Sequence, residues 1–355
     1  MNYQQPFSPY GQNNQYNFNN NFNNNYNGDY YLLKNKHKAS ISTVSKVCGA
    51  AVTAFIVLGT ILGLVLSQVD GFEELYKNNE YFVSALTALM SLFTLGLPFL
   101  IAYKSLKKRN YVNDLPLGKP YDNKEFALLI PITVMICILG SIATGMFSTF
   151  CEAVFEIEFS QPDDGSTYST FSTVAMSFFV TAVIPAFVEE FAIRGVVMQS
   201  LRKYGDGFAI IMSSFVFALM HGNMIQIPFA FIAGIGIGYA VIKTGTMWTG
   251  IIIHFINNAI AVISMTVSQN CSDEITNMFA MILYTVVFAV GIICFALYAN
   301  DRKQKALGGA FSKNTLSKGC TSALTSGEKA ISFIFSAPMI IAEVLLIVET
   351  SLYIN

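Results

Sequence analysis

Long apolar stretches alternate along the chain with short polar segments that carry most of its charged residues. Eight of these stretches approach the roughly 20 residues that an α-helix needs to cross a bilayer. The pattern therefore predicts eight transmembrane helices, at 44–67, 80–103, 126–150, 170–203, 207–222, 225–242, 246–266 and 276–298. Pro185 lies inside the fourth and predicts a bend there, because proline removes a backbone hydrogen bond. The expected fold class is all-α: a polytopic membrane helical bundle.

The two ends of the chain do not follow this pattern. Residues 1–40 begin with an Asn-rich sequence that has no apolar face, which predicts a disordered tail. N-terminal transmembrane helices at 41–123 precede a membrane core at 124–300, a linker at 301–330 and a last apolar segment at 331–355. That segment suits either a ninth transmembrane helix or a helix associated with the membrane surface, and its path stays open.

Composition supports a membrane protein and sets its orientation. Hydrophobic residues make up 53% of the 355 residues and charged residues 12%, which is about half the charged share of a soluble domain. A net charge of −1 without a basic stripe excludes a nucleic-acid partner. Lys and Arg gather before the first predicted helix and after the second, fourth, sixth and eighth, and acidic residues fill the other loops. The positive-inside rule then makes the N-terminus and the end of the eighth helix cytoplasmic.

Polar side chains from three predicted helices reach a similar depth in the membrane. Glu189 lies 14 residues before Lys203, and His221 lies 14 residues after Gly207, so each is ~21 Å from the cytoplasmic end of its helix. On the seventh helix, Asn258 reaches ~18 Å and His254 ~12 Å by the same rise. Ionisable groups at this depth are costly, and they face a bundle interior or a water-filled cavity.

Each of these features alone has a structural explanation. Glu190 and Arg194 are four residues apart and can form a buried structural pair, while Glu189 points about 100° away towards another helix. A single histidine or asparagine, such as His254 or Asn258, is typically an interhelical hydrogen-bond partner. Their convergence at one depth favours a functional site.

The chemistry of this set suits activation of water. A desolvated carboxylate next to a histidine can act as a general base, and His254 and Asn258 could donate hydrogen bonds to an oxyanion. Two histidines and a glutamate could equally hold a divalent metal such as zinc, in which case Glu189, His221 and His254 are the candidate ligands. The residues alone leave open whether a metal is needed.

The glycines of "AGIGIGYA" at 233–240 do not indicate a dinucleotide site, because no strand precedes them and their spacing is G-x-G-x-G. Gly234 and Gly238 are four residues apart in an apolar helix, which predicts close packing against a neighbouring helix.

Three motifs in this region resemble those of the CAAX protease and bacteriocin-processing (CPBP, Abi) intramembrane proteases. "EEFAIR" at 189–194 is similar to their E-E-x-x-x-R motif, "FALMH" at 217–221 to F-x-x-x-H and "HFINN" at 254–258 to H-x-x-x-N. The resemblance covers residues 124–265. It implies an eight-helix core in which Glu189 and His221 activate water, His254 and Asn258 stabilise the oxyanion, and Glu190 and Arg194 support the site.

The resemblance implies a multi-pass cell-membrane endopeptidase whose partners are the lipid bilayer and a membrane-associated peptide or protein substrate. The Asn-rich tail and low-charge helices are typical of a bacterial protein, which places hydrophobic peptides ahead of prenylated CAAX proteins as substrates. Two alternatives remain: a bacteriocin-immunity or peptide-sequestering protein without catalysis, and an ion-coupled transporter. No inverted repeat of the predicted helices supports the transporter.

Overall fold

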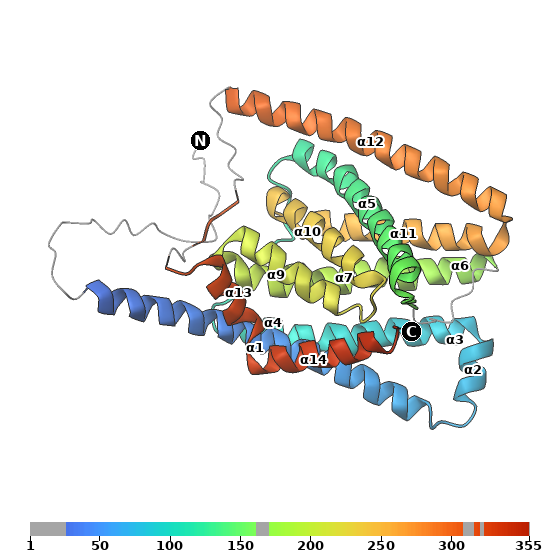
Figure 1. Cartoon of the computed structure of the whole chain (residues 1–355), viewed down its shortest axis with the longest axis horizontal. Helices are drawn as coiled ribbons and strands as arrows, with labels where there is room; N and C mark the ends of the chain where they lie inside the picture. Colours follow the sequence, from blue (N-terminus) through green and yellow to red (C-terminus); the bar gives the residue numbers. More distant parts are fainter. Residues whose placement is uncertain (1–25, 161–169, 308–315, 320–322, 355) are drawn as a thin grey trace.

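The computed structural model describes residues 26–160, 170–307, 316–319 and 323–354. In these ranges the ordered elements are helices, and the only β-type pairing is an isolated bridge between Phe159 and Ile354. The predicted all-α fold class is confirmed (Figure 1).

Within the described residues, seven helical stretches are long and apolar enough to cross a membrane. They are α1 (Tyr26–Leu66), α3 to α4 (Glu80–Lys108), α5 (Asn123–Phe155), α6 to η4 (Phe171–Tyr204), α10 (Gln226–Thr244), α11 (Met247–Asn270) and α12 (Asp273–Leu307). The number rises to eight if α13 (Ser326–Ile334) and α14 (Ala337–Ser351) form one span bent by 75°. The chain is therefore a multi-pass membrane protein.

The fifth predicted span is shorter than expected. Instead of residues 207–222, the structure has α9 (Asp206–Leu219), whose 14 residues extend only ~21 Å. The helix stops because Gly222 adopts a left-handed conformation with φ of 63°, and the Asn223 side chain accepts a hydrogen bond from the Gln226 backbone at 2.9 Å. A hydrocarbon core is ~30 Å thick, so α9 is too short to cross it as one helix.

Both predicted polar end segments are partly helical. Residues 26–40, expected in the disordered tail, form the start of α1, and residues 1–25 lie outside the described ranges. Ion pairs to Glu328 from Lys34 at 2.7 Å and Lys38 at 3.2 Å, one turn apart on α1, anchor this start. The linker expected at 301–330 is shorter as well, because α12 continues to Leu307 and α13 begins at Ser326.

The last helix, α14, lies along α1 (Figure 1). Ser45 on α1 donates a hydrogen bond to the Phe333 carbonyl and shares another with the Ser336 hydroxyl at 2.7 Å, where α13 turns into α14. Gly49 meets the α14 backbone directly, since a Cβ there would lie 2.5 Å from the Met339 nitrogen. The absence of a side chain at Gly49 therefore sets how closely the first and last helices approach.

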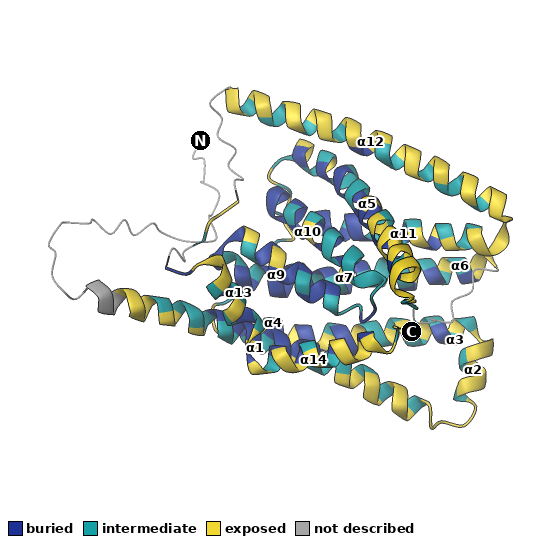
Figure 2. Cartoon of the chain, in the orientation of Figure 1, coloured by how far each residue is buried: buried dark blue, intermediate teal, exposed yellow. Residues whose placement is uncertain are grey.

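The core of the bundle surrounds α9 and α10 (Figure 2). Gly234 on α10 packs against Ser214 of α9, and a Cβ added to this glycine would lie only 2.9 Å from the Ser214 Cβ. The close packing predicted from the glycine spacing is confirmed. At the periphery, α12 buries only Gly291 along its length. Its exposed apolar residues suit contact with lipid.

Candidate active site

The two glutamates lie between two irregular segments of one long helix. They end α7 (Ile184–Glu190), which follows the π-helical segment η2 (Phe178–Val183) and precedes the π-helical segment η3 (Phe191–Met198). A π-helical turn holds one more residue than an α-helical turn, and such turns occur frequently at functional sites. Pro185, near the start of α7, lacks the N–H that would continue the regular ladder across this junction.

Glu190 and Arg194 are both fully buried and form an ion pair at 3.0 Å. The guanidinium lies 4.6 Å from the centre of the Phe217 ring, and its Nη2 donates to the Gly234 carbonyl at 3.4 Å. The pair predicted from the i,i+4 spacing is present, and it links the long helix to α9 and α10. A buried pair with these additional contacts fixes the position of both side chains.

Glu190 also contacts the first histidine of the third motif. His254 on α11 is buried and places Nδ1 3.1 Å from Oε1 of Glu190. The sequence predicted Arg194 as the partner of Glu190 and did not predict this second contact. Because one carboxylate oxygen contacts both a guanidinium and an imidazole, Glu190 holds the orientation of His254.

Gly250 provides the space for this carboxylate. It lies one helical turn before His254 on α11, and a Cβ at this position would be 2.4 Å from Oε2 of Glu190. The spacing of Gly250 and His254 on one helical face was visible in the sequence, but the approach of a carboxylate from another helix was not.

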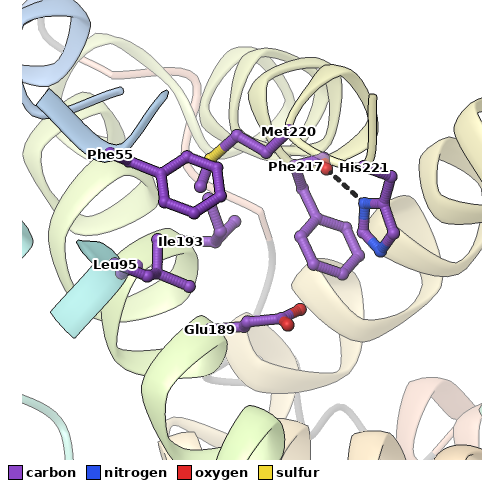
Figure 3. Close-up of a pocket in the computed structure, with 8 residues that line it drawn as sticks. Phe55, Leu95, Glu189, Ile193, Phe217, Met220 and His221 are labelled. Atoms are coloured by element: carbon purple, nitrogen blue, oxygen red, sulfur yellow. Dashed lines mark hydrogen bonds between the residues drawn. The ribbon is translucent and has the colours of Figure 1, made fainter. Parts of the chain in front are cut away.

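Glu189 faces away from the buried pair and lines a cavity of about 70 Å³. Its side chain is 26% exposed, and its Oε2 lies 3.8 Å from Nε2 of His254. Figure 3 shows the Glu189 carboxylate below the Phe217 ring, with His221 beside that ring. This volume is enough for one or a few water molecules. Such a water would lie in a cavity lined by the Glu189 carboxylate and the His221 imidazole.

His221 occupies the turn after α9, not the helix predicted for it. Its Nδ1 lies 2.8 Å from the Phe217 carbonyl, and the two rings meet edge to face with centroids 4.8 Å apart. Phe217 and His221, which are four residues apart, therefore lie on the same face of the chain. The turn contacts α14 at Gly222, because a Cβ at this glycine would lie 3.1 Å from Cδ of Glu349.

Asn258 is held further from the cavity. Its Nδ2 donates to the Thr181 carbonyl in η2 at 2.9 Å, and its Oδ1 accepts from Asn257 at 3.2 Å. It is absent from the cavity lining, whereas two residues that carried no signal in the sequence, Phe55 of α1 and Leu95 of η1 (Ser91–Gly96), are present.

The predicted ligand set does not fit a metal ion. Among the described residues no group of three or more His, Cys, Asp or Glu side chains is arranged to hold one. Glu189 approaches His254 at 3.8 Å, while His254 directs Nδ1 to Glu190.

Comparison with known proteins identifies the class of this site. Residues 171–260 match the family model described as type II CAAX prenyl endopeptidase Rce1-like, and this segment contains all six predicted site residues. No curated protein and no solved structure matches the chain. Residues 171–260, about a quarter of the chain, are therefore similar to a family of CAAX prenyl endopeptidases.

Proposed function

We propose that the chain hydrolyses peptide bonds of membrane-associated or hydrophobic peptides with a water molecule activated by Glu189 and His221. The observation that carries this proposal is the small cavity that these two side chains line together with apolar residues. Apolar walls exclude bulk water and strengthen the interactions of the few polar groups inside.

The hydrogen bonds support a division of roles around the water. If Nδ1 of His221 donates to the Phe217 carbonyl, Nε2 of the neutral ring is an acceptor and can hold one water proton. Glu189 accepts the other proton as the water oxygen attacks the peptide carbonyl carbon. Glu189 then gives this proton to the leaving amine, so that one water and one peptide bond yield a carboxylic acid and an amine.

The oxyanion of the tetrahedral intermediate needs donors, and His254 and Asn258 can supply them. His254 can donate through Nε2 to the oxyanion while Nδ1 donates to Glu190 when the ring carries both protons. An asparagine amide has two N–H donors, and Thr181 uses one of those of Asn258. Glu190 and Arg194 position His254 and do not contact the substrate.

The test is cleavage of a membrane-peptide library, including prenylated CAAX peptides, by the full chain in proteoliposomes. Glu189→Gln and His221→Phe should each lower kcat by about 10²- to 10⁴-fold, the usual contribution of a general base. Glu152→Gln, the same carboxylate-to-amide change at an exposed position on α5, should leave cleavage unchanged. Undiminished cleavage in both cavity variants would remove the proposed mechanism. Peptide binding without products from the wild-type chain would instead support the sequestering alternative.

A further inference from the structure

A second polar region lies where the start of α1, the segment between α4 (Leu97–Lys108) and α5, and the end of the long helix that carries Glu189 meet. Two cavities, of about 440 and 220 Å³, adjoin here because Tyr111 and Lys203 line both. We call them together the basic groove. Its other lining residues include Lys36 and His37 on one side and Gln199 and Arg202 on the other.

The charge of the basic groove is positive. Its one acidic lining residue, Asp114, pairs with Lys107, and Arg202 pairs with Asp206 at 2.8 Å. Lys36 has no ion pair among the described residues. The ammonium of Lys203 lies 4.0 Å from the centre of the Tyr111 ring, a cation–π contact that holds this cation where the two cavities adjoin.

A third lysine, which is buried, adds to the positive charge of the basic groove. Lys329 of α13 is buried, and its Nζ donates to the Tyr204 carbonyl at 2.7 Å. Tyr204 itself lines the larger cavity. Cations gathered around one cleft raise the local positive potential, so this part of the molecule favours an anion.

Two buried polar atoms around the basic groove also lack hydrogen-bond partners among the described residues. They are Nε2 of Gln199 in the smaller cavity and Nδ1 of His37 in the larger one. A buried N–H without an acceptor costs about 1–3 kcal/mol. An oxygen-rich anion in the groove would supply the missing acceptor for Gln199.

We infer that the basic groove binds a phosphate-bearing anion between Lys36 and Lys203. Lysine is a common partner of phosphate as a point charge, and tyrosines such as Tyr111, Tyr121 and Tyr204 are enriched at the level of lipid headgroups. The larger cavity has the size of a small-molecule site. The headgroup of an anionic lipid and a soluble phosphate share this chemistry.

The experiment uses the full chain in neutral detergent and native mass spectrometry to titrate phosphatidylglycerol, with phosphatidylcholine as the lipid without net charge. Lys36→Gln combined with Lys203→Gln should weaken phosphatidylglycerol binding about 30-fold, at roughly fivefold per lysine. Lys104→Gln combined with Lys303→Gln removes the same charge from exposed positions outside the groove and should change binding less than about twofold. Lys36→Gln alone, at an exposed position, should weaken it about fivefold and tests the inference if the double variant does not fold.

Inorganic phosphate as a competitor distinguishes the two sources of the anion. Displacement of the lipid would assign the groove to a soluble phosphate, and resistance to displacement would assign it to a lipid headgroup. Equal losses in both double variants would show attraction to general surface charge and overturn the inference. Binding of phosphatidylglycerol no tighter than that of phosphatidylcholine, with no binding of phosphate, would overturn it as well.

Discussion

Gly250→Ala is expected to displace the buried carboxylate that orients His254. An alanine Cβ at this position would lie 2.4 Å from Oε2 of Glu190 and 2.9 Å from a methyl group of Val241. The carboxylate cannot simply rotate away, because Oε1 is held by Arg194 at 3.0 Å and by His254 at 3.1 Å. The substitution must therefore move a helix or break one of these contacts.

The expected size of the effect follows from two opposing contributions. Alanine in place of glycine within a helix stabilises by about 0.5–1 kcal/mol, whereas overpacking costs about 1–3 kcal/mol, and a weakened buried ion pair adds to that cost. We expect a net loss of about 1–3 kcal/mol. Because His254 loses its fixed orientation, kcat should fall by at least about tenfold, with a smaller change in KM.

The matched control is Gly145→Ala on α5, where a Cβ would have nothing within 4 Å. This variant should be stabilised by about 0.5–1 kcal/mol and remain fully active. Stability is measured by unfolding with SDS in mixed micelles, and activity by peptide cleavage in proteoliposomes. If Gly250→Ala matched Gly145→Ala in both measurements, the close approach of Glu190 to α11 would be refuted.

Three further outcomes test other parts of the molecule. Glu190→Gln alone should lower the free energy of unfolding by about 3–5 kcal/mol, because it leaves Arg194 buried without its counter-charge. The double variant with Arg194→Met should lose less stability than this. Additive losses in a double-mutant cycle would contradict the pairing. Gly49→Ala should push α14 off α1 and increase proteolysis after residue 337, and protection equal to that of the wild type would count against the backbone contact. Asp122 accepts a hydrogen bond from Lys305 at 2.7 Å, which lowers the pKa of its carboxyl below 3.8. The ionised carboxyl of Asp122 therefore contributes to stability above about pH 3.8, and this contribution is lost as the pH falls through the lowered pKa. Asp122→Asn should make the free energy of unfolding less dependent on pH below 4, as measured by unfolding across that range.

The hydrophobic pattern was sufficient to predict the helical membrane class, because apolar length alone determines which segments can cross a bilayer. It overestimated the helix after Gly207, since the residues up to Gly222 are apolar enough to continue while the backbone turns at Gly222. It also could not reveal that residues 26–40 are helical. Their helix is anchored by Glu328, almost 300 residues away in the sequence.

The candidate site was predictable to the level of helical faces. The spacing of Glu190 and Arg194 predicted their ion pair. Because adjacent residues on a helix point about 100° apart, the same reasoning directed Glu189 away from this pair, where it lines the cavity. The contact between Glu190 and His254 was missed, because helical spacing relates residues on one helix and says nothing about which helices meet. The contribution of Phe55 to the cavity was missed for the same reason.

The packing of α14 on α1 has a consequence for how the protein is made. Thr53 on α1 donates to the Pro338 carbonyl, a contact that spans 285 residues of sequence. At the usual pace of synthesis, α1 is complete roughly 15 to 60 seconds before its partner helix exists. Only when residue 349 has emerged can its carboxylate reach Gly222 next to His221. During its own biogenesis the nascent chain therefore stays structurally incomplete in the membrane until α14 has been translated.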